Sequence, residues 1–120
     1  MYLEKIKNYV SGIDIPIVEV PADEIEQGLK IYLKSFNAGE RMHLYYIYDN
    51  DLKSASMDEK ALYSLMFMMC DKDGNRTENP ENYGALCDLP LPLLQRLMDA
   101  QSRLINSEEV KKSSEQTMVG

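Results

Sequence analysis

The side chains that most often carry chemistry are few and scattered in this chain. Its single histidine, His43, has neither a second histidine nor a cysteine near it in the sequence, so it is not half of a metal site. The serines lack the G-x-S-x-G setting of a nucleophile elbow, and no glycine-rich phosphate loop is present. We therefore interpret His43 as a surface or rim residue, and predict that the protein is not an enzyme and uses no cofactor.

Two acidic residues close together, Asp71 and Asp73, raise the question of a cation site or a carboxylate pair. A calcium-binding EF-hand loop needs a glycine at its sixth position and an acidic residue at its twelfth. Counted from Asp71, Gly74 is the fourth residue and Asn82 the twelfth, so the pattern fails. A polar turn in which Gly74 supplies a left-handed backbone explains the segment. We predict no metal site and no catalytic residue here.

The two cysteines, Cys70 and Cys87, each lie among apolar residues at the end of a predicted helix. This setting is typical of reduced core cysteines in a cytosolic protein. A disulfide between them is the alternative that the sequence leaves open.

Length and charge narrow the class of partner. A chain of 120 residues is one domain by length, and its formal net charge is −7. This charge disfavours binding to nucleic acid, where Lys and Arg must neutralise phosphates, and to an anionic membrane surface. No run of about 18 apolar residues exists, and Met1–Gly12 lacks the apolar stretch of a signal peptide. We expect a cytoplasmic protein with a protein partner.

Two extended segments near the N-terminus predict an antiparallel β-hairpin. β-Branched residues dominate Ile15–Pro21, and apolar and polar side chains alternate along Gly28–Phe36. Two strands alone are marginal in water, so the hairpin must lie on helices or pair with another chain. Before it, Met1–Val10 places apolar residues at helical spacing, but the run is short, and it could form one or two frayed turns or an extended arm.

Helix-capping signals predict about four helices after the hairpin. Asn37 with Glu40, and Ser56 with Glu59, have the spacing of capping boxes, and Asn79 precedes a proline at a first helical position. The last helix follows Pro90 and Pro92 and ends near Asn106. We therefore predict an α+β fold, a mostly α-helical domain of about four helices with a short N-terminal antiparallel β-hairpin. This domain spans residues 1–106, and a flexible polar tail spans residues 107–120.

Part of the apolar helical surface exceeds what one core-facing stripe requires. The second capped helix is apolar nearly all round in its C-terminal half, and methionine side chains adapt well to irregular partners. These residues either pack in the core or form a hydrophobic surface for a partner helix. We predict five of them, on this helix and on the last one, as candidate protein-binding residues: Met66, Phe67, Met68, Leu94 and Met98.

The order of several short motifs resembles that of the tail assembly chaperones of long-tailed bacteriophages. The resemblance covers roughly Gly28 to Asn106. The residues that carry it are the alternating run Leu29–Phe36, the helix start Ala38-Gly39-Glu40-Arg41, the turn Cys70-Asp-Lys-Asp-Gly74, the Leu-Pro-Leu-Pro-Leu-Leu segment and the helix end Leu104-Ile105-Asn106.

The resemblance implies a function. Such proteins are small, mostly helical modules that bind the tape measure protein and keep it soluble while the tail tube protein polymerises around it. The expected partners are thus the tape measure protein, the tail tube protein and further copies of the chain, in the host cytoplasm. The alternative is a small acidic adaptor or inhibitor that acts through its charged surface. Salt distinguishes the two, since charge-driven binding weakens as ionic strength rises and apolar binding does not.

Overall fold

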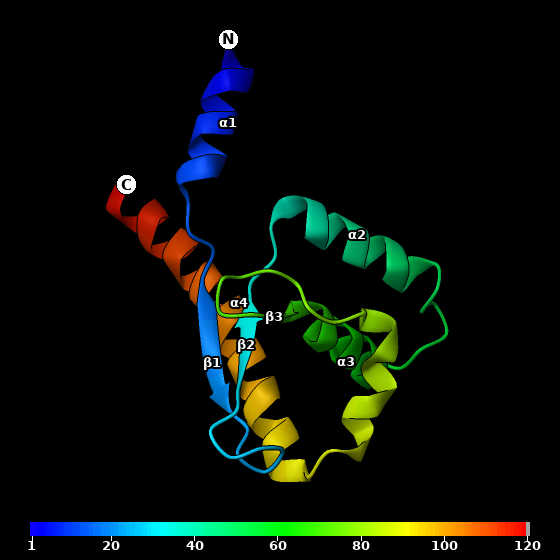
Figure 1. Cartoon of the computed structure of the whole chain (residues 1–120). Coiled ribbons are helices and arrows are strands. Elements are labelled where there is room, and N and C mark those ends of the chain that lie inside the picture. Colours follow the sequence, from blue (N-terminus) through cyan, green and yellow to red (C-terminus); the bar gives the residue numbers. More distant parts are fainter. Residues whose placement is uncertain (120) are drawn as a thin grey trace.

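The computed structural model describes the backbone of residues 1–119 and the side chains of residues 1–105 (Figure 1). In chain order the elements are α1 (Tyr2–Gly12), β1 (Ile17–Pro21), β2 (Lys30–Lys34), α2 (Ala38–Asp49), α3 (Met57–Met68), β3 (Met69–Cys70), the 3-10 helix η1 (Pro80–Asp88) and α4 (Leu91–Val119). The predicted α+β class is confirmed. The finer prediction differs, because the described residues form five helices and three strands.

The sheet is antiparallel, with strand order β1-β2-β3. The predicted hairpin is present, with Val18 opposite Leu33 and Val20 opposite Ile31. The third strand is a correction: Met69 and Cys70, expected to end the helix, turn extended and pair with β2. This pairing satisfies backbone groups that β2 would otherwise leave at a free edge.

The core lies where α4 and α3 pack against the sheet. α4 contacts β1, β2 and α3, while η1 packs along α3. The largest fully buried side chains come from the sheet and from both helices: Leu33, Leu65, Met68, Leu93 and Leu97. Ala100 and Leu104 continue the buried stripe of α4. The period of this stripe, three or four residues, is that of an amphipathic helix with one covered face.

The capping residues lie where the sequence predicts them. Asn37 and Glu40 form a complete capping box at the start of α2. The Ser56 side chain accepts a hydrogen bond from the Glu59 backbone N–H at the start of α3, and Asn79 accepts one from Glu81 at η1. Gly74 has the predicted left-handed backbone, with φ of 88°. Local chemistry thus fixes the starts of three helices.

One side chain, Arg76, joins several elements. Its guanidinium donates one hydrogen bond from Nε–H to a carboxylate oxygen of Glu40 (2.8 Å) and one from an NH2 group to the other oxygen of that carboxylate (3.0 Å). The remaining donors reach the backbone carbonyls of Lys34, Met68 and Ser35, each at 2.9 Å. All five guanidinium N–H groups are therefore used. We call Arg76 with these partners the Arg76 hub; it links α2, the end of α3 and the end of β2.

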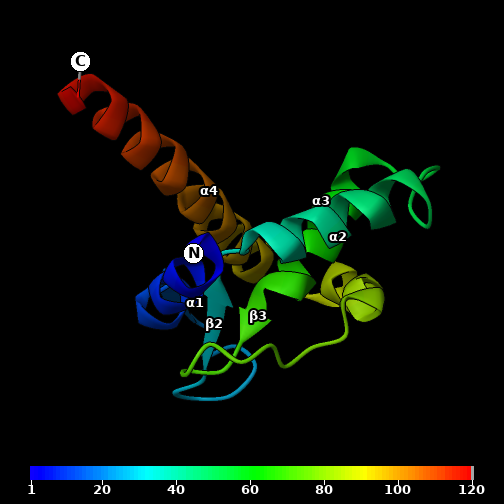
Figure 2. The ribbon, with the colours of Figure 1, turned by 90° about the horizontal axis from the view of Figure 1, so that it is seen from above.

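The two ends of the chain stand out from this body. α1 buries no residue and stands clear of the sheet and the other helices (Figure 1). Seen from above, α4 continues past the rest of the molecule as far as Val119 (Figure 2). The backbone of residues 107–119, predicted as a tail, is thus helical, and the side chains there lie outside the described residues.

The cysteine prediction holds for only one of the two residues. Both are free, and Cys70 is buried, but Cys87 is exposed on η1. Only the inner face of this short helix, with Leu86, reaches the core.

Candidate protein-binding site

The five residues predicted to bind a partner do not form an exposed surface. Met66 and Met68 are 7% and 1% exposed and belong to the hydrophobic core. This is a correction, because side chains so deeply buried are not accessible to a partner of the folded monomer. Leu94 and Met98 are partly buried and pack against the same core. The all-round apolar pattern of α3 therefore reflects burial on several sides.

Phe67, the fifth predicted residue, is half-buried in an aromatic cluster. Its ring lies edge-on to Phe36, with centroids 5.0 Å apart, and to His43 at 6.2 Å. The Arg76 guanidinium is 5.7 Å from its centroid. Phe67 thus packs against the Arg76 hub, and His43 is exposed, as predicted for a surface residue.

The most exposed apolar surface lies instead on α1. At about 100° per residue, the large apolar side chains of α1 and that of Ile13, its C-cap residue, fall within an arc of about 120°. Every one of them is exposed, and α1 contributes nothing to the core. We call this set the α1 apolar face: Tyr2, Leu3, Ile6, Tyr9, Val10 and Ile13. A helix whose apolar side faces water is one that another molecule is expected to cover.

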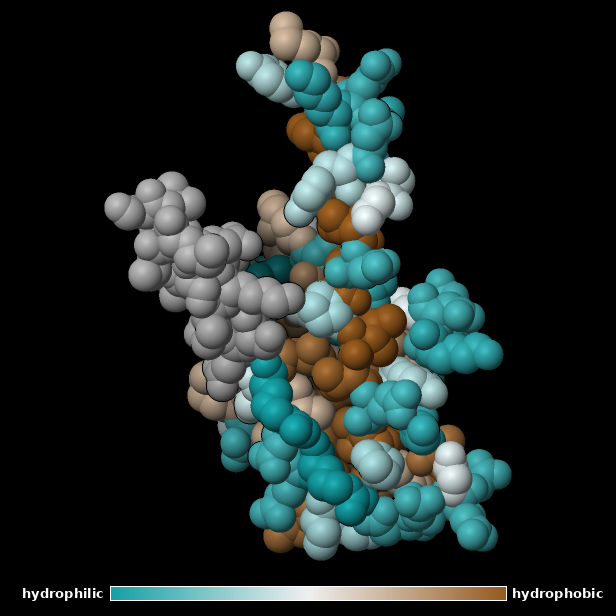
Figure 3. All heavy atoms as spheres, turned by 90° about the vertical axis from the view of Figure 1, so that its left-hand side faces the viewer, coloured by the Kyte–Doolittle hydropathy of each residue, from teal (hydrophilic) through white to brown (hydrophobic). Residues whose placement is uncertain are grey.

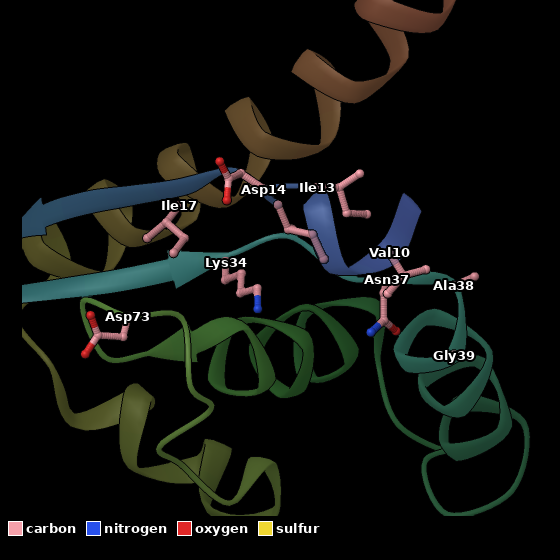
Figure 4. Close-up of a pocket in the computed structure, with 10 residues that line it drawn as sticks. Val10, Ile13, Asp14, Ile17, Lys34, Asn37, Ala38, Gly39 and Asp73 are labelled. Atoms are coloured by element: carbon pink, nitrogen blue, oxygen red, sulfur yellow. The ribbon is translucent and has the colours of Figure 1, made fainter. Parts of the chain in front are cut away.

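A hollow of about 650 Å³ lies at the base of α1 (Figure 4). Val10 and Ile13 line it from the α1 side, Ile17 from β1, and Ala38 and Gly39 from the start of α2. Three charged side chains also line it: Asp14, Lys34 and Asp73. Apolar and polar side chains thus share the lining of the hollow.

The outer side of α2 extends this apolar surface. Met42, Tyr45 and Tyr46 are exposed, and helical spacing places them on the same side of α2 as Ala38. We call these four residues the α2 outer face. Because Ala38 also lines the hollow, the hollow joins the α2 outer face to the α1 apolar face. Figure 3 shows hydrophobic side chains continuing from α1 down one side of the body.

Two charged residues at or near the hollow, Lys34 and Asp71, are engaged within the fold. The Lys34 ammonium donates to the Gly74 carbonyl at 3.2 Å. Asp71 accepts hydrogen bonds from the backbone of Asn75 and Asp73, and those from Asn75 contribute most to a pKa below the usual value for its carboxyl. These contacts explain the acidic turn as a structural feature.

No group of three or more His, Cys, Asp or Glu side chains gathers as a metal site would, among the residues described. Within the same part of the chain, no helix is long and apolar enough to cross a membrane. What this surface offers is apolar area on a short helix, a hollow and a second helix.

The sequence contains the signal for this surface, though we did not predict it as a site. Leu3, Ile6 and Val10 have helical spacing, and adding Tyr2, Tyr9 and Ile13 to them makes one complete arc. What periodicity does not reveal is that no other part of the chain covers the arc. The chain was also compared with known protein families, with curated proteins and with solved structures, and none of these comparisons finds a match.

Proposed function

We propose that this protein is a tail assembly chaperone of a long-tailed bacteriophage, which binds the tape measure protein and keeps it soluble without catalysing a reaction. The observation that carries the proposal is the α1 apolar face, six apolar side chains that nothing in the described chain covers. The motif order between Gly28 and Asn106 supplies the family resemblance. Tape measure proteins are, by that resemblance, the clients.

The proposed mechanism is helix-in-surface binding. A helical client segment lies along α1, places side chains in the hollow and reaches the α2 outer face. Each large apolar side chain that becomes fully covered contributes about 1.5–3 kcal/mol. α1 has 11 residues, and a helix this short is marginal in water without packing. Binding therefore both covers α1 and stabilises it.

Further partners follow from the same proposal. The tail tube protein would displace the chaperone as it polymerises around the tape measure protein in the host cytoplasm. Self-association is a separate expectation, which the outer edge of β1 supports, because among the described residues β1 pairs only with β2.

The test is co-expression of the tape measure protein with the wild-type chain or with the double variant Ile6→Gln/Val10→Gln. Glutamine keeps helix propensity while removing apolar area. We expect at least a tenfold loss of soluble client. The matched control is Ile25→Gln in the loop between β1 and β2, at the other end of the sheet (Figure 1), since Ile25 is 54% exposed and Ile6 57%. Equal client solubility with all three proteins would contradict the proposal.

The net charge of −7 favours one other candidate, an acidic adaptor that binds a basic partner through charge. The two differ in their response to salt. Between about 0.05 and 0.5 M salt, binding through the α1 apolar face changes little, whereas charge-driven binding weakens sharply. Client capture that is lost in high salt, and is indifferent to Ile6→Gln/Val10→Gln, would support the adaptor instead.

A further inference from the structure

Two lysines flank the α1 apolar face. At about 100° per residue, Lys5 lies roughly 40° beyond Tyr9 on one side of the arc, and Lys7 lies roughly 40° beyond Leu3 on the other. Both lysines are exposed. Glu4, the only acidic residue of α1, lies on the opposite side of the helix. Each long edge of the apolar face therefore has a positive charge.

This charge pattern contrasts with the rest of the molecule. Residues 1–13 contain two lysines and one glutamate, whereas the whole chain has a formal net charge of −7. The charges of the α2 outer face are mixed: by helical position Arg41 lies at one edge and His43 at the other, while the exposed Asp49, the last residue of α2, lies between them. Cationic or ionisable nitrogen groups thus border both helical parts of the proposed site.

We propose that the polypeptide held on the α1 apolar face is an amphipathic helix whose own apolar stripe is flanked on both sides by Asp or Glu. The inference rests on the proposed binding function and names the chemistry of its partner. When such a helix lies against α1, its acidic side chains meet Lys5 and Lys7 at the two edges, while the apolar stripes face each other. The stripe supplies affinity, and the flanks select the partner.

A second copy of this chain is a poorer match for the same face. Two α1 helices packed face to face would bring lysines together at each edge of the contact, and like charges there are destabilising. The α2 outer face of another copy offers Arg41 and His43 at its edges. Neither of these two faces of a second copy therefore supplies acidic flanks on both sides of an apolar stripe, which is what the charges of α1 require.

The expected size of the effect is moderate, because these ion pairs are exposed. Each exposed pair changes a dissociation constant by a factor of about 1.5 to 5. With two lysines, and more than one acidic residue in reach of each, we expect an acidic-flanked helix to bind about tenfold more tightly than a lysine-flanked one in low salt. The difference is expected to shrink several-fold at about 0.5 M salt.

The experiment uses the full-length protein and two designed helical peptides that share one apolar stripe. One peptide has Glu at the flanking positions and the other has Lys, and dissociation constants are measured by fluorescence anisotropy. We expect the Glu peptide to bind about tenfold more tightly. The double variant Lys5→Glu/Lys7→Glu is expected to reverse the preference. The control Lys53→Glu, an exposed lysine in the loop after α2, is expected to leave it unchanged.

The outcomes separate this inference from the proposed function. Equal affinity for both peptides would overturn the charge selection and leave the binding function in place. If neither peptide binds but the tape measure protein is still kept soluble, the inference also fails by itself. If neither peptide binds and the tape measure protein is not kept soluble either, the proposed function fails as well. Tight binding to phosphatidylserine vesicles, weakened by Lys5→Glu/Lys7→Glu and without a peptide preference, would replace the acidic helix by an anionic membrane.

Discussion

α1 and α4 are both amphipathic helices, yet they relate to the rest of the chain in opposite ways. The stripe of α4 is buried through Leu93, Leu97, Ala100 and Leu104. The stripe of α1 is as continuous, but none of its residues is buried. An apolar stripe therefore indicates that a helix needs a covering surface, and does not tell whether its own chain supplies one.

The way in which each helix is connected to its neighbour in the chain explains why α4 is covered and α1 is not. α4 directly follows η1 and lies along the sheet, so its stripe meets β1 and β2. α1 ends at Gly12, and Ile13 is already extended, with φ of −91° and ψ of 147°. Pro16 then restricts Ile15 to extended conformations. The chain thus enters β1 without the reversal that would return α1 to the body.

The largest contrast is expected from matched leucine truncations. Leu97→Ala removes a side chain that is 0% exposed, and we expect a loss of about 3–5 kcal/mol in the free energy of unfolding. Leu3→Ala removes an exposed one and is expected to change stability by less than about 0.5 kcal/mol. Urea denaturation followed by circular dichroism measures both. Similar losses in the two variants would mean that α1 packs on the body after all.

The Arg76 hub provides a second, smaller contrast within the body. Arg76→Gln leaves Glu40 and three backbone carbonyls without their donor. Because the Arg76 side chain is about a fifth exposed, we expect a loss of about 2–3 kcal/mol, below that of a fully buried pair. The same urea measurement tests it. In a double-mutant cycle, Arg76→Gln/Glu40→Gln is expected to lose less than the sum of the single variants; strict additivity would show that the pair does not interact.

Hydrogen exchange tests the contrast without a mutation. In the free protein, we expect the amides of α1 to open with a free energy of about 0–1 kcal/mol, because no packing holds this short helix. The amides at the centre of α4 are expected to open only with global unfolding. Addition of the tape measure protein is expected to protect α1 selectively. Strong protection of α1 in the free protein would show that another part of the chain covers it, which would contradict our interpretation of α1 as an uncovered helix.

The smallest predicted effect is a pH dependence at the hub. Burial raises the pKa of Glu40, but the hydrogen bonds from Arg76 and from the Asn37 backbone N–H outweigh it, so this pKa is lowered overall. A carboxyl whose pKa is lower in the folded state stabilises the fold above its unfolded pKa, near 4.5. This stability is lost as the pH falls through the lower, folded pKa. Urea denaturation between about pH 6 and pH 3 is therefore expected to show a smaller slope for Glu40→Gln than for the wild type. Identical slopes would show that Glu40 does not contribute to the pH dependence of stability.

Local features of the fold were predictable from the sequence, whereas the site was not. Asn37, Ser56 and Asn79 cap helices because their side chains bond to backbone within a few residues, which needs no knowledge of the rest. The burial of Met66 and Met68 could not be predicted in the same way, because it depends on η1 and α4 both covering α3. The hub was equally hidden, because Arg76 lies 36 residues after Glu40, its partner.

The turn that precedes Arg76 fixes the length of one segment of the chain. Cys70 and Arg76 form an antiparallel β-bridge. The Asp71 N–H donates to the Asn75 carbonyl at 2.9 Å, and the Thr77 N–H donates to the Met69 carbonyl. Adding or removing a residue between Cys70 and Arg76 would displace the guanidinium from all its acceptors at once. Between Thr77 and Asn79, by contrast, the chain is exposed and has no strand partner. Homologous proteins should therefore keep the first spacing constant and vary in length only after it.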